Sequence, residues 1–258
     1  MGAPSFEYIP GRYGYTVERT GPVAVAGRIP LEPSLSDDAG NLRTAAVLMG
    51  IDMTCGMAAG LGVLPNWTVT ADADVHLVGV CRVGPLRIDA SNVRAGRSMS
   101  VVQARAVDEG ANDTLVAVAT ANHGVLESTF EHRIAAAGVG EVQQFARPDR
   151  PVDESIETYF GLTVGDGLAT IGLDERTTNP WGIFHGGLHG LLVDTCARQA
   201  GLASWTHVAL RFLNAVKEGP ATARTTEAIA TGDRRIVRVE VRDEGSGRLA
   251  VIAHVTGR

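Results

Sequence analysis

Two stretches decide the fold of this 258-residue chain: Met99-Ser-Val-Val-Gln-Ala-Arg-Ala-Val107, followed by Asp108-Glu109-Gly110, and Arg235-Ile-Val-Arg-Val-Glu-Val-Arg242, followed by Asp243-Glu244-Gly245. Each is rich in β-branched residues and leads through its turn into a second apolar run, over residues 114–121 and 249–255. A strand, a tight turn and a returning strand form a β-hairpin. The sequence therefore predicts one hairpin in each half of the chain.

The markers around these hairpins recur at a constant spacing. Gly84-Pro85 and Gly219-Pro220 precede them, and both the Gly-Pro pair and the Asp-Glu-Gly turn return 135 residues later (84 to 219 and 108 to 243). Upstream, residues 42–61 and 186–203 are rich in Ala, Leu, Met and Gly. Because apolar side chains occupy nearly every face of these two segments, each is predicted to be a buried helix. This self-similarity indicates two copies of one small domain.

We predict an α+β fold of two repeats, each with a curved antiparallel sheet wrapped around a long buried helix. The N-terminal repeat is expected over residues 1–130 and the C-terminal repeat over residues 158–258. The polar segment 131–157, which contains Pro148 and Pro151, is expected to be the linker. A sheet of about five strands leaves an exposed edge, which the second copy can cover.

Composition excludes several classes of protein. The chain is 45% hydrophobic and 20% charged, which is typical of a folded domain rather than a disordered one. Its formal net charge is −6 and it has no basic stripe, so nucleic acid is not an expected partner. Neither a signal peptide nor a membrane span is indicated. The three cysteines, Cys55, Cys81 and Cys196, lack CxxC spacing, which favours a reducing, cytoplasmic setting. Cys55 and Cys196 lie on the predicted buried helices and are expected to be inert core thiols.

The segment Asn179-Pro-Trp-Gly-Ile-Phe-His185-Gly186-Gly187-Leu-His189-Gly190-Leu-Leu-Val-Asp194 contains the densest group of residues suited to chemistry. It predicts a loop, a His-Gly-Gly turn and then a helix. A helix start carries unpaired N–H donors and a partial positive charge, so it can stabilise an oxyanion. Glycine lets a substrate approach the backbone closely. The alternative is that His-Gly-Gly is only a tight helix entry.

One acidic residue lies inside each predicted buried helix, Asp52 in the first and Asp194 in the second. A buried carboxylate is costly, so each is either tied to neighbouring groups or retained for function. Asp194 follows Gly186 by eight residues, which is about 12 Å along one helix. The two cannot act on the same atom. If the helices pack antiparallel about a pseudo-twofold axis, however, Asp52 lies near Gly186.

The motif Asn179…His185-Gly186-Gly187…Asp194, with the two Gly-Pro and Asp-Glu-Gly hairpins, resembles the PaaI-like acyl-CoA thioesterases of the hotdog fold. The resemblance covers about residues 23–258 and implies a double hotdog. It implies that the Gly186 N–H polarises the thioester carbonyl and that Asn179 assists. It also implies that an Asp of the partner helix serves as nucleophile or general base, with a Ser or Thr beyond it holding the attacking water.

Transferring this pattern to the first half reveals an asymmetry. Counting back from Asp52, the Asn, His and Gly positions are occupied by Asp37, Arg43 and Thr44. The first half has kept its acid and lost the rest of the motif. The resemblance therefore implies one complete site per chain, made of Asp52 from the first half and three residues from the second: Asn179, His185 and Gly186.

Four further residues complete the predicted site. Thr70 lies 18 residues after Asp52 and is the candidate hydroxyl that holds water. Gly187 and Trp181 are candidates for binding the substrate. Asp194 is included among the catalytic candidates, although with the first-half motif lost it is expected to be a relic, a structural residue or part of a modified second pocket.

The resemblance implies an enzyme, a thioesterase that hydrolyses a fatty or aryl acyl-CoA to the free acid and CoA. The main alternative is a non-catalytic acyl-CoA- or lipid-binding hotdog protein; a hydratase ranks last because neither helix has a His beside its Asp. His185 and His189 are four residues apart but lack a third ligand, so no metal is expected. No cofactor is expected, because CoA is part of the substrate. A homo-oligomer of double hotdogs is expected by resemblance.

Overall fold

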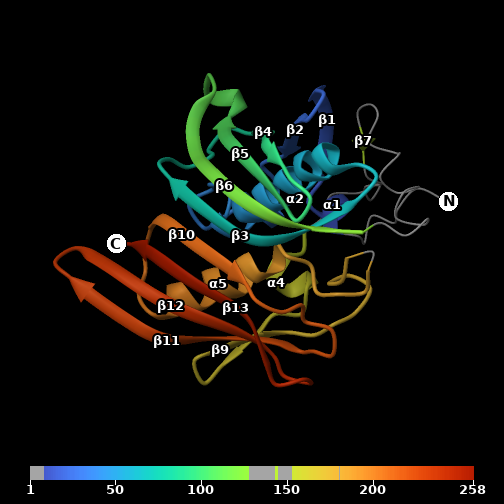
Figure 1. The fold of residues 1–258 in the computed structure, drawn as a ribbon. Helices are drawn as coiled ribbons and strands as arrows, with labels where there is room; N and C mark the ends of the chain where they lie inside the picture. Colours follow the sequence, from blue (N-terminus) through green and yellow to red (C-terminus); the bar gives the residue numbers. More distant parts are fainter. Residues whose placement is uncertain (1–8, 128–142, 145–152, 180) are drawn as a thin grey trace.

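The computed structural model describes residues 9–127, 143–144, 153–179 and 181–258, and it shows two similar halves placed side by side (Figure 1). Each half has one long helix, packed against the strands of the same half. In the first half this is α2 (Thr44–Val63), and in the second it is α5 (Leu188–Gln199). The architecture confirms the predicted double hotdog.

The first half contains these further elements: α1 (Ile9–Arg12), β1 (Thr16–Gly21), β2 (Ala24–Ile29), the short 3₁₀ helix η1 (Pro33–Leu35), β3 (Trp67–Leu77), β4 (Leu86–Ala95), β5 (Met99–Asp108), η2 (Glu109–Ala111) and β6 (Thr114–Leu126). The second half contains α4 (Ile156–Tyr159), β8 (Thr163–Gly165), β9 (Leu168–Ile171), β10 (Trp205–Phe212), β11 (Ala221–Thr231), β12 (Arg234–Asp243) and β13 (Arg248–Gly257). The two predicted hairpins are confirmed as β5–β6 and β12–β13.

All the described strands form one antiparallel sheet in the order β7-β1-β2-β4-β5-β6-β3-β10-β13-β12-β11-β9-β8. The halves join at its centre, where β3 pairs with β10; Val75 lies opposite Val208, and Ala73 lies opposite Leu210. Outward from this seam, the strands of one half follow the same order as those of the other. In a separate repeat, β3 or β10 would be an exposed edge strand. Here each of the two strands is covered by the other repeat, as the sequence predicted.

The two helices begin and end close to their predicted limits. The second ends earlier than the predicted residue 203, because Gly201 adopts a left-handed φ of 84° that stops the helix. Most of the predicted linker lies outside the described residues. Within it, β7 (Gln143–Gln144) pairs with β1, and α4 begins at Ile156.

The helix α2 is long and apolar enough to cross a membrane by length and composition, and no other helix among the described residues meets that test. However, 72% of its most apolar window is buried inside the fold. It packs on β2, β3, β4, β5 and β6 and against α5. We therefore assign it as a core helix.

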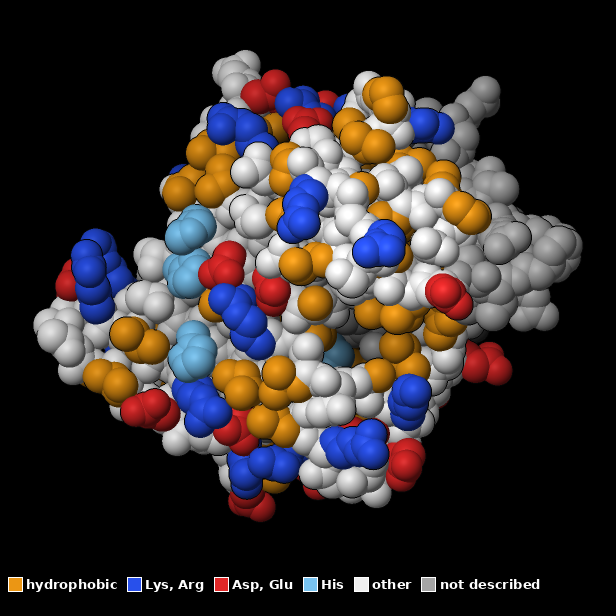
Figure 2. Space-filling model, viewed as in Figure 1, with side chains coloured by type: hydrophobic (Ala, Val, Ile, Leu, Met, Phe, Trp, Pro, Cys, Tyr) orange, Lys and Arg blue, Asp and Glu red, His pale blue; other side chains and the backbone are white. Residues whose placement is uncertain are grey.

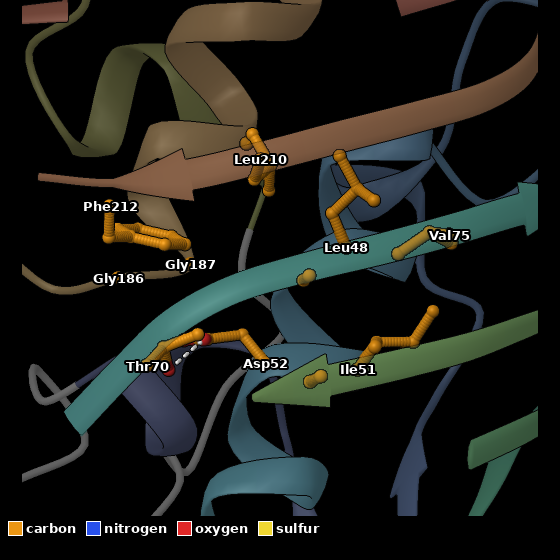
Figure 3. A pocket seen from close by; sticks show the side chains of 12 residues that line it. Leu48, Ile51, Asp52, Thr70, Val75, Gly186, Gly187, Leu210 and Phe212 are labelled. Carbon is orange, nitrogen blue, oxygen red and sulfur yellow. Dashed lines mark hydrogen bonds between the residues drawn. The ribbon is translucent and has the colours of Figure 1, made fainter. Parts of the chain in front are cut away.

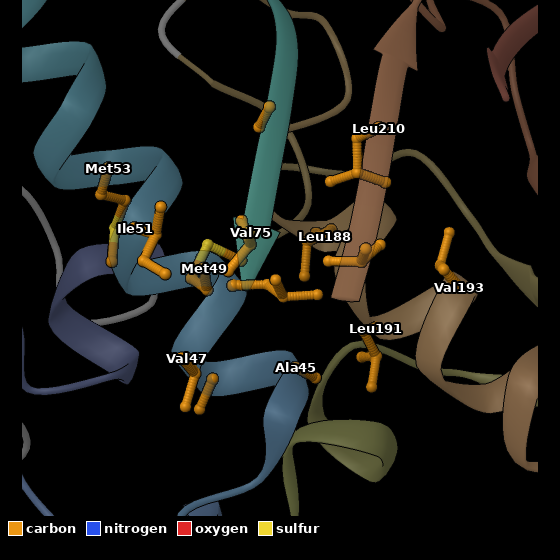
Figure 4. Packing of buried hydrophobic residues seen from close by; sticks show 14 of the residues in the cluster. Ala45, Val47, Met49, Ile51, Met53, Val75, Leu188, Leu191, Val193 and Leu210 are labelled. Carbon is orange, nitrogen blue, oxygen red and sulfur yellow. The ribbon is translucent and has the colours of Figure 1, made fainter. Parts of the chain in front are cut away.

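Apolar side chains from both helices meet under the central strands (Figure 4). Met49 and Leu48 of α2 and Leu188 and Leu191 of α5 are all at most 4% exposed. The contact is close because α5 presents glycine: a Cβ atom at Gly190 would lie 3.1 Å from the Cβ of Leu48. This packing brings the start of α5 against the middle of α2.

Candidate active site

Asp52 on α2 lies directly against the start of α5. A Cβ atom at Gly186 would be 3.0 Å from Asp52 Oδ2 and 3.3 Å from Oδ1, so the backbone of the second half approaches a carboxylate of the first. The Thr70 hydroxyl, on β3, donates a hydrogen bond of 2.9 Å to Asp52 Oδ1 (Figure 3). The structure thus brings together an acid, a hydroxyl and a helix start, drawn from both halves of the chain.

A narrow apolar pocket continues from these groups between the two helices and the central strands (Figure 3). Its free space holds about one water molecule. Figure 2 shows a hollow in this face of the molecule, near the boundary between the halves and rimmed by hydrophobic side chains. Asp52 and Thr70 form its polar end, and three glycines line it at the start of α5: Gly186, Gly187 and Gly190. The remaining lining residues are apolar: Leu48, Ile51, Ala73, Val75, Ala121, Leu210 and Phe212.

His185 organises the turn that precedes α5. Its ring is buried, and Nδ1 accepts a hydrogen bond of 3.1 Å from the Gly187 N–H, which places the ring proton of the neutral form on Nε2. Burial lowers the pKa of His185 to about 4, so the ring is neutral at physiological pH. The Gly186 N–H donates no hydrogen bond to any residue that the structure describes. It is the free donor at this helix start.

Burial raises the pKa of the Asp52 carboxyl, although its side chain retains 17% exposure. The Thr70 hydrogen bond, the buried ring of His123 and the Gly187 N–H all act in the opposite direction, because they favour the ionised form. His185 Nδ1 lies 4.0 Å from Asp52 Oδ2. A carboxylate with a raised pKa is a stronger base than an exposed one, and it reaches the pocket where the free Gly186 N–H also lies.

Asn179 and Trp181 lie outside the set of residues that line the pocket. Asn179 Oδ1 accepts hydrogen bonds from the backbone N–H groups of Trp181 (3.0 Å) and Ile183 (3.3 Å), so this side chain shapes the loop before α5. The Trp181 ring packs against Trp67 with centroids 4.2 Å apart. The roles predicted for Asn179 and Trp181 at the Asp52 site stay predictions.

Asp194 has different surroundings from Asp52. Its side chain is 7% exposed, and both oxygens lie 3.0 Å from Nε of Arg198, four residues later on α5. Arg43, which stands where the second half has its His, is paired at 2.8 Å with Glu157 of α4. Both Arg43 and Glu157 act electrostatically on Asp194. The pseudo-symmetric counterpart of the Asp52 site is thus filled with ion pairs.

In the part of the chain that the structure describes, no group of three or more His, Cys, Asp or Glu side chains is placed to bind a metal ion. Nδ1 of His189 bonds the Gly186 carbonyl at 3.0 Å, while Nδ1 of His185 bonds the Gly187 N–H, so these ring nitrogens are engaged with backbone. The three cysteines are free and buried, and burial raises the pKa of each thiol. Thiols held in this protonated form are poor nucleophiles.

Sequence reasoning missed His123, a buried residue of β6 that acts electrostatically on Asp52. It lies 71 residues after Asp52, outside both helices, and only strand pairing brings it to the site. The one available signal was the alternation of β6, in which His123 falls on the same face as the apolar Ala119 and Ala121.

With this geometry in view, comparison with known proteins is informative. Residues 53–124 match the family model of the acyl-CoA thioesterase N-terminal domain. The solved structure of the 12:0-ACP thioesterase from Umbellularia californica has a TM-score of 0.63 at 10% identity, covering 92% of this chain and 94% of that chain. The chain has the hotdog fold of thioesterases. The tesB protein MAP1729c of Mycobacterium avium subs paratuberculosis shares this double hotdog, with a TM-score of 0.59 at 12% identity over 93% of this chain and 94% of that chain.

A curated relative is the Pasteurella multocida protein named "Putative esterase PM0788", which is 31% identical over 84 residues. The match covers 30% of this double hotdog and 60% of the relative's length. Together the comparisons show the hotdog fold and a likeness of residues 53–124 to the acyl-CoA thioesterase N-terminal domain. Assignment to the PaaI-like group stays a prediction.

The buried histidines predict a loss of stability in acid. Burial lowers the pKa of His189 to about 4, below its ordinary value of 6.5. The unfolded chain therefore binds a proton that the folded chain excludes, and stability falls as the pH drops from about 6.5 toward 4. His189→Asn removes this pH-dependent loss of stability, and its amide can still donate a hydrogen bond to the Gly186 carbonyl. When the pH is lowered from about 7.5 to 5, the Tm of the wild type should fall by about 5 °C more than the Tm of the variant.

Loss of the exposed His254 provides the control for this measurement. His254→Asn, at an exposed position of β13, should follow the wild-type pH dependence. Identical pH dependence in His189→Asn and the wild type would contradict the assignment of a buried neutral ring to His189.

Proposed function

We propose that this chain is an acyl-CoA thioesterase with one composite site, in which Asp52 of the first half activates water and Gly186 of the second half binds the thioester carbonyl. The observation that carries the proposal is the approach of the Asp52 carboxylate to within 3.0 Å of a Cβ position at Gly186, beside a free N–H. A base and an oxyanion donor are the two groups that thioester hydrolysis requires.

The chemistry proceeds in two steps. A water molecule beside Asp52 and Thr70 attacks the carbonyl carbon; Asp52 accepts a proton from it, and the new oxyanion accepts a hydrogen bond from the Gly186 N–H. The intermediate then collapses, the C–S bond breaks, and the proton held by Asp52 passes to the departing CoA sulfur. The products are the free acid and CoA. The partial positive charge at the start of α5 stabilises the oxyanion.

The pocket favours an acyl group that is apolar. Beyond Asp52 its walls are aliphatic or aromatic, from Leu48 and Ile51 on α2 to Leu210 and Phe212 on β10. Fatty and aryl acyl groups both suit such a lining chemically, and the lining side chains must move to admit them, because the free space holds about one water molecule. Because a structural neighbour is a 12:0-ACP thioesterase, acyl groups carried on acyl carrier protein belong in the substrate panel beside CoA esters.

Thiol release tests the proposal. Purified protein is assayed with acetyl-, butyryl-, octanoyl-, palmitoyl- and benzoyl-CoA and with lauroyl-ACP, using a chromogenic thiol reagent. We expect turnover of at least one ester. Acyl-CoA binding with no thiol release would favour the alternative of a non-catalytic binding protein. Hydration of an enoyl-CoA without hydrolysis would favour a hydratase. That reaction needs an Asp and a His close together, and His123 lies near Asp52.

Removal of the Thr70 hydroxyl tests the water-holding role. Thr70→Val preserves shape but loses the 2.9 Å hydrogen bond to Asp52, so we expect kcat/KM to fall by about 10–100-fold with KM little changed. Thr120→Val, on the exposed face of β6, is the matched control and should retain activity. Equal activity of Thr70→Val and wild type would remove Thr70 from the proposed mechanism.

The same proposal has consequences for the cofactor, the cellular compartment and the oligomeric state. CoA enters and leaves as part of the substrate and product, so the site needs no resident cofactor. We propose a cytoplasmic enzyme, in keeping with its free cysteines, and a homo-oligomer of double hotdogs. Size-exclusion chromatography with light scattering measures the oligomeric state.

A further inference from the structure

His123 is a buried polar residue with no assigned role in the scheme above. It is 1% exposed, and within the described part of the chain neither ring nitrogen makes a hydrogen bond of good geometry; the backbone of Ala121 is its nearby polar group. Burying an imidazole without partners is costly and destabilises the fold. A side chain retained at such a cost invites a functional explanation.

Strand pairing places His123 beside the proposed water site. On β3, Thr70 lies directly opposite His123 of β6, and residues opposite each other in an antiparallel pair have Cβ atoms about 4.5–5.5 Å apart on the same face. Thr70 in turn donates its hydrogen bond to Asp52 Oδ1. Ala121, two residues earlier on the same face of β6, lines the pocket. His123 thus lies one side chain away from the Asp52 carboxylate, under the pocket.

Among the described residues, few charged or titratable groups lie around Asp52. His185 reaches it from the turn before α5, and Cys55 lies one turn further along α2. His185 is neutral above about pH 4, and the Cys55 thiol stays protonated, because its pKa is raised by burial. The neighbouring β3 and β5 present the uncharged hydroxyls of Thr70 and Ser100 opposite His123. His123 is therefore the neighbour whose charge can change together with that of Asp52.

We propose that His123 is a positioning residue for the Asp52 base: its buried imidazole stabilises the ionised carboxylate electrostatically, next to Thr70, and so keeps Asp52 able to accept a proton from water. The inference rests on the proposed function for its consequence in catalysis. Burial raises the pKa of Asp52 and lowers that of His123, and against this trend each group favours the charged form of the other. His123 neither gives nor takes a proton in this scheme, so the proton still passes from water to Asp52 and then to the CoA sulfur.

The pH dependence of hydrolysis tests this role. In His123→Gln, a polar side chain that cannot titrate replaces the ring, and we expect the acidic limb of the kcat/KM profile to move upward by about 0.5–1 pH unit. Activity at low pH should fall about 3–10-fold, with kcat affected more than KM. His254→Gln, at an exposed position of β13, should leave the profile unchanged. A uniform loss with an unmoved limb in His123→Gln would mean a purely structural role and overturn the proposal.

A second measurement needs neither catalysis nor the His123 variant to fold. Imidazole carbon NMR signals of the wild type and of Asp52→Asn are titrated with pH, and the His123 signal is assigned by through-bond correlation. Electrostatic coupling is reciprocal. We therefore expect the pKa of His123 to be lower in Asp52→Asn by about 0.5 unit or more. Equal values would overturn the proposal even if hydrolysis is observed, whereas coupling without hydrolysis would refute only the proposed function.

Discussion

Asp52→Asn is expected to lower kcat/KM for the best thioester substrate by about 10²–10⁴-fold, the usual contribution of a general base. The amide has the shape of the carboxylate and can still accept the 2.9 Å hydrogen bond from Thr70, so the fold should persist. What is lost is the ability to take a proton from water. Because burial raises the pKa of this carboxyl, it is a stronger base than an exposed Asp, which favours the upper part of that range.

Substrate binding serves as the internal control for this variant. The pocket walls are untouched, so the affinity of Asp52→Asn for a non-hydrolysable acyl-CoA thioether should stay within about threefold of wild type. Loss of binding together with turnover would instead indicate a disrupted pocket. Retention of full activity would contradict the assignment of Asp52 as the base.

Gly187→Ala is expected to have the second large effect, through packing. A Cβ atom there would lie 2.2 Å from the sulfur of Met49 and 3.1 Å from its Cα, so the Met49 side chain must move and the backbones of α2 and Gly187 must give slightly. The backbone of Gly187 is itself ordinary, with φ −66°, so the clash alone causes the effect. We expect a loss of about 1–3 kcal/mol in the free energy of unfolding. Activity should fall by up to about 100-fold, because the turn that carries the Gly186 N–H shifts relative to Asp52 and a misplacement of about 1 Å can have that effect.

The chain offers a control and a rescue for this substitution. Gly172→Ala meets no atom within 4 Å and should be neutral in both unfolding and hydrolysis. Met49→Ala combined with Gly187→Ala removes the clash with sulfur, so the double variant should recover activity relative to Gly187→Ala. Urea unfolding and thiol release measure the two effects. Unperturbed stability in Gly187→Ala would mean that the helices are not held at this distance.

Much of the fold was predictable because its signals are local or repeated. The Gly-Pro pairs and Asp-Glu-Gly turns define the hairpins, and Asp108 and Asp243 each accept hydrogen bonds from three backbone N–H groups just before a Gly-Pro pair. Composition alone marks α2 as a core helix. The antiparallel placement of Asp52 and Gly186 followed from the pseudo-symmetry of two equivalent helices.

The rest depended on tertiary contacts that no spacing reveals. The sequence shows that Arg198 follows Asp194 by one helical turn, a spacing that allows an ion pair. It does not show that this turn is buried, so that the ion pair fills the second site. Asn179 follows the family pattern in sequence, but its side-chain oxygen bonds its own loop. His123 reaches Asp52 through the register of β6 on β3, which sequence periodicity does not specify between distant strands.

The central claim, that one site per chain works and that it contains Asp52, is tested most directly by comparing Asp52→Asn with Asp194→Asn in the same thiol-release assay. Asp194 is bound to Arg198 in a site filled by ion pairs, so its substitution should change kcat/KM by less than about threefold while Asp52→Asn loses at least about 100-fold. Loss of turnover in Asp194→Asn, with Asp52→Asn still active, would contradict the account and assign catalysis to the other half.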